Sequence, residues 1–130
     1  MKMKIKGLIV IAVCLITLLA LPLISSALQI KGLVFDDKNC NGNKNLGEKG
    51  IAGVTIALTP GPLFAVTNAK GRFTFTGLTP GTYVLSEADP AGYCSTSPNT
   101  RIVRLVFKDV TGQLFADSKK AVSPPSGCCP

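Results

Sequence analysis

Glycine and proline recur throughout the chain after Ala27, and between them apolar residues alternate with polar ones. Alternation places every second side chain on the same face of a strand, whereas an amphipathic helix needs apolar residues three and four positions apart. The segment 72–76 is typical, because Phe73 and Phe75 are separated and flanked by polar residues. Frequent glycine and proline also interrupt helices. The sequence beyond Ala27 therefore predicts strands and argues against a sustained helix.

About seven short strands are expected, separated by recognisable turn signals. Asn68 to Gly71 offers residues that tolerate a positive φ, and Pro80 with Gly81 suits the central positions of a type II turn. Short strands at this spacing, with no helices between them, indicate a single antiparallel two-sheet sandwich of the immunoglobulin-like kind. The expected strands are 28–35, 54–58, 63–67, 72–76, 82–87, 101–107 and 113–116.

The N-terminal segment has the layout of an export signal. Three lysines precede an apolar run over 7–24, which is followed by Ser25, Ser26 and Ala27. This order predicts a secretory signal peptide cut before Leu28. An uncleaved anchor is the alternative, since about 18 apolar residues just suffice to cross a bilayer. The expected organisation is a signal peptide or anchor (1–27), a sandwich domain (28–118) and a tail rich in proline, serine and cysteine (119–130), in a secreted or cell-surface protein.

Charge and composition exclude several functions. Three of the 14 basic residues lie in the leader, so the net charge of +7 falls to +4 without it. The remaining cations are scattered and aromatic residues are few, which argues against a nucleic-acid groove. The chain has no histidine, which removes histidine-based triads and most zinc sites. Cys94 lacks a nearby base and Asp89 precedes Pro90 as a turn residue, so we expect no enzymatic activity.

Four cysteines follow the leader, namely Cys40, Cys94, Cys128 and Cys129. An even number in an oxidising compartment allows three pairings. We expect Cys40 to pair with Cys94. A bridge between the adjacent Cys128 and Cys129 would be strained. An intermolecular bond through the tail, or four partly free thiols, are the alternatives.

The segment from Asp37 to Glu48 fits the calcium-loop pattern D-x-[DN]-x-[DN]-G-x₅-E. Calcium takes six to eight hard oxygens, and Gly42 would allow the sharp bend that wraps the chain around the ion. Only two candidate ligands are charged, so we expect weak binding, on the order of 10⁻⁴ to 10⁻³ M. An asparagine-rich loop held by its own hydrogen bonds is the alternative. The expected ligands are Asp37, Asn39, Asn41, Asn43 through its carbonyl, Asn45 directly or through water, and Glu48.

Several motifs in order resemble the SdrD B-like domain of bacterial and archaeal surface proteins, within the prealbumin-like and Cna-B-like group. They are the segments 32–35, 37–48, 50–54, 67–75, 78–83 and 90–93. The resemblance implies a calcium-stabilised, non-catalytic sandwich that serves as a stalk, spacer or binding module outside the cell. It names no partner. An accessory domain that binds a glycan or protein through end loops, with Tyr93 and Phe64 as surface aromatics, is the alternative function.

Related Cna-B domains carry an internal bond between a lysine and an asparagine, promoted by an acidic residue. Glu87 resembles that acid in position, but Val34 stands where the reactive lysine is expected and Lys31 is displaced from it. We therefore expect no such bond, and we expect Glu87 to be an exposed strand residue.

Overall fold

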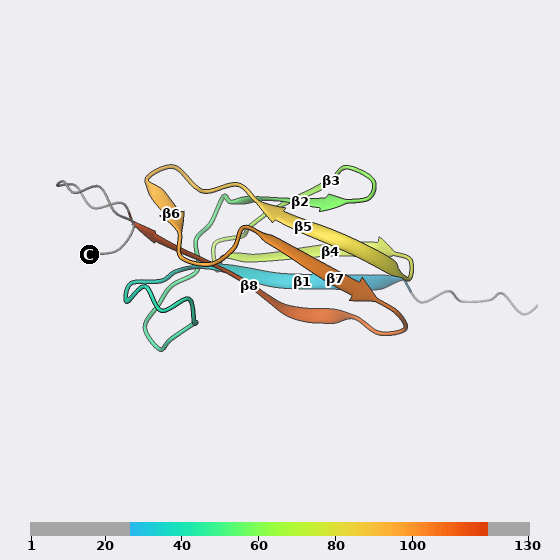
Figure 1. Ribbon diagram of the computed structural model, residues 1–130, viewed down its shortest axis with the longest axis horizontal. Coiled ribbons are helices and arrows are strands. Elements are labelled where there is room, and N and C mark those ends of the chain that lie inside the picture. Colours follow the sequence, from blue (N-terminus) through green and yellow to red (C-terminus); the bar gives the residue numbers. More distant parts are fainter. Residues whose placement is uncertain (1–26, 120–130) are drawn as a thin grey trace, which may run out of the picture.

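The computed structural model describes residues 27–119, which form two packed four-stranded sheets (Figure 1). Residues 1–26 of the predicted leader and the two tail cysteines fall outside this range. One sheet has the order β4-β1-β8-β6 and the other has the order β3-β2-β5-β7. The strands are β1 (Leu28–Asp36), β2 (Thr55–Thr59), β3 (Leu63–Val66), β4 (Arg72–Leu78), β5 (Gly81–Glu87), β6 (Tyr93–Ser95), β7 (Thr100–Leu105) and β8 (Val110–Lys119).

The predicted all-β sandwich is confirmed, and the alternation seen in the sequence explains its core. Phe73 and Phe75 of β4 are buried while Arg72, Thr74 and Thr76 are exposed. Inward-facing apolar side chains from both sheets meet in one cluster, because each sheet buries one face against the other. Its most deeply buried members are Ile30, Val34, Ile56, Leu58, Leu85 and Phe115, all 0% exposed.

Two features of the sheets differ from expectation. The structure has eight strands because Tyr93–Ser95 adds to the edge of β8, where three residues are too few to show alternation. The pairing of β1 with β8 is parallel, with Val34 opposite Phe115, whereas the other strand pairs are antiparallel. The first and last strands therefore lie side by side in the middle of one sheet.

The turn predictions had mixed outcomes. Gly71 has a φ of 75° and its amide donates to the carbonyl of Asn68, so the turn expected at 68–71 is confirmed. The prediction of a type II turn at Pro80 and Gly81 is wrong. Gly81 is already part of β5, opposite Leu105, and it is not among the residues with a positive φ, which instead include Gly77.

Three backbone segments meet where β1 ends. The amide of Val34 donates to the carbonyl of Gly71, and the amide of Ile51 donates to the carbonyl of Val34. A Cβ at Gly50 would overlap the carbonyl of Lys70, so this approach requires glycine. The segment 37–49 is thereby held as a closed loop between β1 and the β3–β4 turn.

Among residues 27–119 we find no helix that is long and apolar enough to span a bilayer.

Candidate calcium-binding loop

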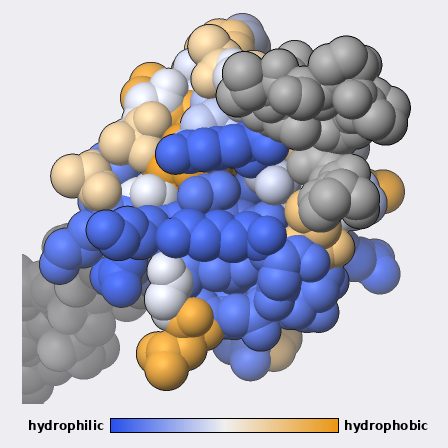
Figure 2. Space-filling model, turned by 90° about the vertical axis from the view of Figure 1, so that its left-hand side faces the viewer, coloured by the Kyte–Doolittle hydropathy of each residue, from blue (hydrophilic) through white to orange (hydrophobic). Residues whose placement is uncertain are grey.

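The loop 37–48 follows β1 at the end of the sandwich where β6 lies and where β8 terminates (Figure 1). Figure 2 looks at this end and shows a surface that is largely hydrophilic. Phe35, the penultimate residue of β1, is 0% exposed but is not part of the central apolar cluster. Lys44 of the loop places its ammonium 5.8 Å from the centre of the Phe35 ring. The loop therefore folds back over the end of β1.

Asp37 opens the loop and is fully buried. Its Oδ1 accepts from the amide of Asn41 at 3.2 Å, and its Oδ2 accepts from the amide of Gly42 at 2.7 Å. The hydroxyl of Thr96 donates to Oδ2 at 2.6 Å. Burial raises the pKa of Asp37, but these hydrogen bonds outweigh it and the net pKa lies below its usual range. The carboxylate is therefore ionised at neutral pH.

Glu48 closes the loop and is also buried. Its Oε1 accepts from the amide of Lys38 at 3.1 Å, and its Oε2 accepts from the amide of Asn45 at 2.8 Å. Each carboxylate oxygen can accept more than one bond. Both oxygens of Glu48 thus fix the loop backbone while retaining a lone pair.

The amide side chains of the loop mainly contact the loop itself. Oδ1 of Asn39 accepts from the amide of Asn41 at 3.3 Å, and Oδ1 of Asn41 accepts from the amide of Asn43 at 2.8 Å. Oδ1 of Asn45 accepts from the side chain of Asn39 at 3.3 Å. The ammonium of Lys44 donates to the carbonyls of Asn45 and Glu48. Such bonds are those expected of an asparagine-rich turn, and they also preorganise side-chain oxygens.

The oxygen atoms of the loop are of the type that calcium prefers, but few of them carry a negative charge. Calcium prefers hard oxygen ligands, and the loop offers two carboxylates and several amide or carbonyl oxygens. Within the described part of the chain, no three acidic, cysteine or histidine side chains form a group that could hold a metal. Any ion here would depend on neutral oxygens, with Asp37 and Glu48 as its only anionic ligands.

Thr96 contributes a hydrogen bond to the loop that the sequence did not reveal. It lies 59 residues after Asp37 and just beyond β6, the strand that the alternation pattern missed. Its amide and that of Ser97 both donate to the carbonyl of Ala116 on β8. This backbone anchoring holds the Thr96 hydroxyl against the first residue of the loop.

A buried acid pair lies between the sheets near the same end. Glu87 is 7% exposed, so its expected exposure is wrong. Glu87 follows Tyr83 and Leu85 on the inward face of β5. The alternation of side chains along the strand, extended by two residues, predicts this position. Asp117 is 0% exposed and continues the inward position of Phe115 on β8.

Burial raises the pKa of Glu87 to about 9, with further increases from its hydrogen bond to Asp117 and from the charges of Asp117 and Asp89. The positive charge of Arg101 lowers the pKa of Glu87, but by less than these effects raise it. The pKa of Asp117 is also raised, chiefly by burial. Other described residues donate no hydrogen bond to the four carboxyl oxygens of this pair. Glu87 therefore remains protonated at neutral pH and shares its proton with Asp117, because two ionised carboxylates side by side would repel each other.

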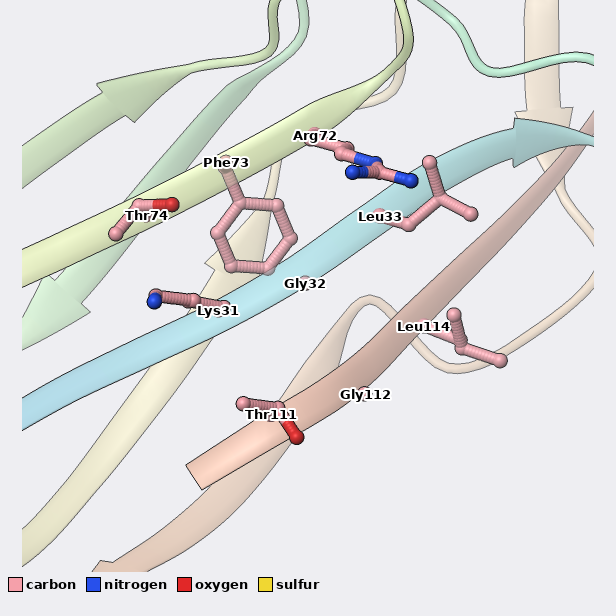
Figure 3. Close-up of a pocket in the computed structure, with 9 residues that line it drawn as sticks. All are labelled: Lys31, Gly32, Leu33, Arg72, Phe73, Thr74, Thr111, Gly112 and Leu114. Atoms are coloured by element: carbon pink, nitrogen blue, oxygen red, sulfur yellow. The ribbon is translucent and has the colours of Figure 1, made fainter. Parts of the chain in front are cut away.

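The lysine that an internal lysine-to-asparagine bond would need is absent from this pair. Val34, which stands where the reactive lysine of related domains is expected, is fully buried in the apolar core. Lys31 lies on the outer face of the β4-β1-β8 sheet, where it lines a shallow hollow of about 450 Å³. Figure 3 shows that hollow with Gly32 and Gly112 on neighbouring strands and Arg72 on β4. Its lining offers cations and hydroxyls but no carboxylate or thiol.

The two described cysteines lie near this end of the molecule. Cys94 is buried on β6, and Cys40 is half-buried in the loop with a φ of 57°. The contact between Thr96 and Asp37 places the segment after Cys94 next to the start of the loop. Their predicted pairing stays a prediction.

Comparison with known proteins identifies the domain. Residues 28–112 match the model of the SdrD B-like domain. A serine-aspartate repeat-containing protein C of Staphylococcus aureus is 39% identical over 70 residues, which is 51% of this chain and 7% of that protein. The chain thus spans only a small part of the curated relatives that it matches.

Solved structures share the fold at low sequence identity. A minor pilin of Streptococcus agalactiae superposes with a TM-score of 0.58 and 20% identity, covering 78% of this chain and 48% of the pilin. A major pilin subunit of Bacillus cereus gives a TM-score of 0.54 and 17% identity, covering 73% and 30%. At these identities the likeness is one of fold. Together with the family match, it shows that this chain belongs to the SdrD B-like domain family.

Proposed function

We propose that the chain is a non-catalytic structural module of a secreted or cell-surface protein, stabilised by calcium at the loop 37–48. The observation that carries the proposal is the placement of Asp37 and Glu48. These buried carboxylates close the two ends of the loop, and each organises backbone amides from inside it. Membership of a family of surface-protein domains, and the shared fold with pilins, support the structural role.

The loop is suited to act as a clamp. Its first residue is joined to β8, because the amide of Asp37 donates to the carbonyl of Asp117 at 2.7 Å. Just before it, the amide of Asp36 donates to the carbonyl of Lys49 at 2.8 Å, which closes the loop on itself. An ion held by Asp37, Glu48 and the asparagine oxygens would supply the positive charge that draws these ends together. The resulting stiffness at one end of the sandwich is what a stalk or spacer requires.

The first prediction concerns calcium and stability. In millimolar calcium the full chain should unfold at a higher temperature than in chelator, because a ligand that binds only the folded state stabilises it. At a calcium concentration of about ten times the dissociation constant, the expected gain is about 1.4 kcal/mol. The double variant Asp37→Asn and Glu48→Gln should lose this gain. Thermal unfolding followed by circular dichroism measures both.

Asp36→Asn is the control for the loss of a negative charge, since it neutralises one carboxylate directly before the loop and should keep the calcium response. Lys44→Gln removes the ammonium that contacts two loop carbonyls and should strengthen the response. Coincident unfolding curves for the unaltered chain, with calcium and with chelator, would eliminate the ion and leave a hydrogen-bonded turn.

The alternative, an accessory domain that binds glycan or protein through its end loops, has less support. The Tyr93 ring is half-buried and lies 6.0 Å from the ammonium of Lys119. Phe64 is 68% exposed, but it lies on β3 rather than among the loops beside β6. The two aromatic rings belong to different sheets and do not form one platform.

The predicted disulfide between Cys40 and Cys94 is a second testable element of the proposal. It would join the loop covalently to β6 and enclose 53 intervening residues, a loop length at which a cross-link contributes about 4 kcal/mol in the chain-entropy model. Peptide mapping of the exported protein under non-reducing conditions should recover the two cysteines in one linked pair. Recovery of either one linked to Cys128 or Cys129 would contradict this pairing.

A further inference from the structure

The end of the sandwich opposite the loop carries an exposed apolar turn. This β7–β8 tip comprises Val106, Phe107, Lys108 and Asp109 and joins two neighbouring strand ends. Phe107 is 83% exposed and Val106 is 58% exposed. These two neighbouring side chains place apolar surface in water at the end of the sandwich, and exposed apolar patches are typical of contacts with proteins or membranes.

The tip lies beside the point where the chain enters the domain. The amide of Gln29 donates to the carboxylate of Asp109 at 3.0 Å, and Ile30 pairs with Val110. Figure 1 agrees, because β1 begins at the end where β7 finishes. Only three residues, 25–27, separate the apolar run 7–24 from the start of β1. Three extended residues span about 10 Å, so a membrane holding that run would lie within reach of the tip.

The charges around the tip suit an anionic lipid surface. Arg104 and Lys108 are exposed, and the one acid of the tip, Asp109, is already bound by the backbone of Gln29. The turn between β4 and β5 borders the same place, where Pro80 and Val106 line a common shallow hollow. An aromatic ring that enters the acyl boundary, with cations at headgroup level, is the arrangement of interfacial anchors.

We propose that, when the N-terminal segment is retained as an anchor, the β7–β8 tip rests on the same membrane and holds the domain upright. Phe107 and Val106 enter the lipid interface while Arg104 and Lys108 contact anionic headgroups. A single aromatic anchor binds weakly by itself, but the short tether gives it a high effective concentration at the bilayer. The polar loop end and the end of β8 then point away from the membrane. This inference depends on the retained anchor and not on calcium.

The test uses the absence of tryptophan from the sequence. Phe107→Trp places a single fluorophore in the tip of the full chain, reconstituted in vesicles of phosphatidylcholine and phosphatidylglycerol. Leu46→Trp is the control, because Leu46 is fully exposed in the loop at the opposite end. Lipids brominated along the acyl chain should quench the tip fluorophore at least about twofold more than the loop fluorophore, since interfacial anchors sit about 5–10 Å deep. Adding Arg104→Glu and Lys108→Glu should reduce that quenching.

Three outcomes would overturn the proposal. The first is equal quenching of the tip and loop fluorophores by lipid. The second is shielding of the tip fluorophore without lipid that grows with protein concentration, which would assign the tip to a second copy of the chain. The third is an intact mass showing that exported protein in the membrane fraction always begins after Ala27. Repeating the quenching in chelator separates this result from the calcium proposal, whose failure would leave the quenching unchanged.

Discussion

Gly50→Ala should destabilise the domain by about 3 kcal/mol or more. Gly50 forms a bridge with Phe35 and lies against the turn that precedes β4. An added Cβ would overlap the carbonyl of Lys70 and lie 2.7 Å from the amide nitrogen of Gly71. Backbone atoms cannot rotate away as a side chain can, so the whole β3–β4 turn would have to shift. Urea unfolding of the purified chain measures the loss.

Gly81→Ala is the matched control for this prediction. A Cβ there would meet only the ring of Tyr83, at 3.6 Å, which is an ordinary contact. Gly81 has no positive φ and lies in β5, so alanine fits the backbone without strain. The free energy of unfolding of the Gly81→Ala variant should differ from that of the unaltered chain by less than about 0.5 kcal/mol. Equal effects at the two positions would show that the close approach at Gly50 is not what limits stability.

The loop should loosen together with this junction. The hydrogen bonds of Val34 with Gly71 and Ile51 are adjacent to Gly50 and fix the exit of the loop. A shift there would move Glu48, whose carboxylate binds the amides of Lys38 and Asn45. Hydrogen exchange of the loop amides in Gly50→Ala should therefore accelerate more than global unfolding alone explains.

The buried acid pair predicts an unusual dependence of stability on pH. The pKa of Glu87 is about 9 in the folded state and near its ordinary value of 4.5 when unfolded. Below the unfolded pKa, both states hold the proton and the contribution of Glu87 to stability is greatest. Between the two pKa values unfolding releases a proton that the folded state keeps, so the free energy of unfolding falls as pH rises, and it levels off above the folded pKa.

The expected fall between about pH 5 and pH 9 is at least about 2 kcal/mol, since relaxation around the pair reduces the ideal one-proton value. Glu87→Gln should flatten this dependence, because an amide can donate to Asp117 without a proton to lose. At high pH the variant should be more stable than the unaltered chain by about 1–2 kcal/mol. Chemical unfolding in chelator at several pH values measures the effect without any contribution from calcium.

Asp36→Asn serves as control here as well, since Asp36 is a partly exposed acid outside the pair and should leave the pH dependence unchanged. Titration of Asp37 does not interfere, because its pKa is lowered and lies below the range in question. A free energy of unfolding that is constant or increases from about pH 5 to pH 9 would contradict the shared proton.

The local pattern of the chain determined most of the strands and the position of the loop. Alternation at Phe73 and Phe75 depends on one face being buried, and that holds whichever strand lies alongside. Gly71 could be assigned to a turn because its positive φ is a property of the backbone itself. The spacing of acids and amides from Asp37 to Glu48 likewise marked the loop, although its ability to bind calcium stays a proposal.

Only the tertiary structure decided which segments meet. The parallel pairing of β1 with β8 unites the two ends of the domain, and an alternating pattern carries no information about a strand's neighbours. The contact of Thr96 with Asp37 and the pairing of Glu87 with Asp117 both depend on that arrangement. Each joins residues that are far apart in sequence and polar by type. The polar side chain of Glu87 suggested that it is exposed. Its position between two packed sheets buries it instead, and the burial raises its pKa so that it keeps its proton.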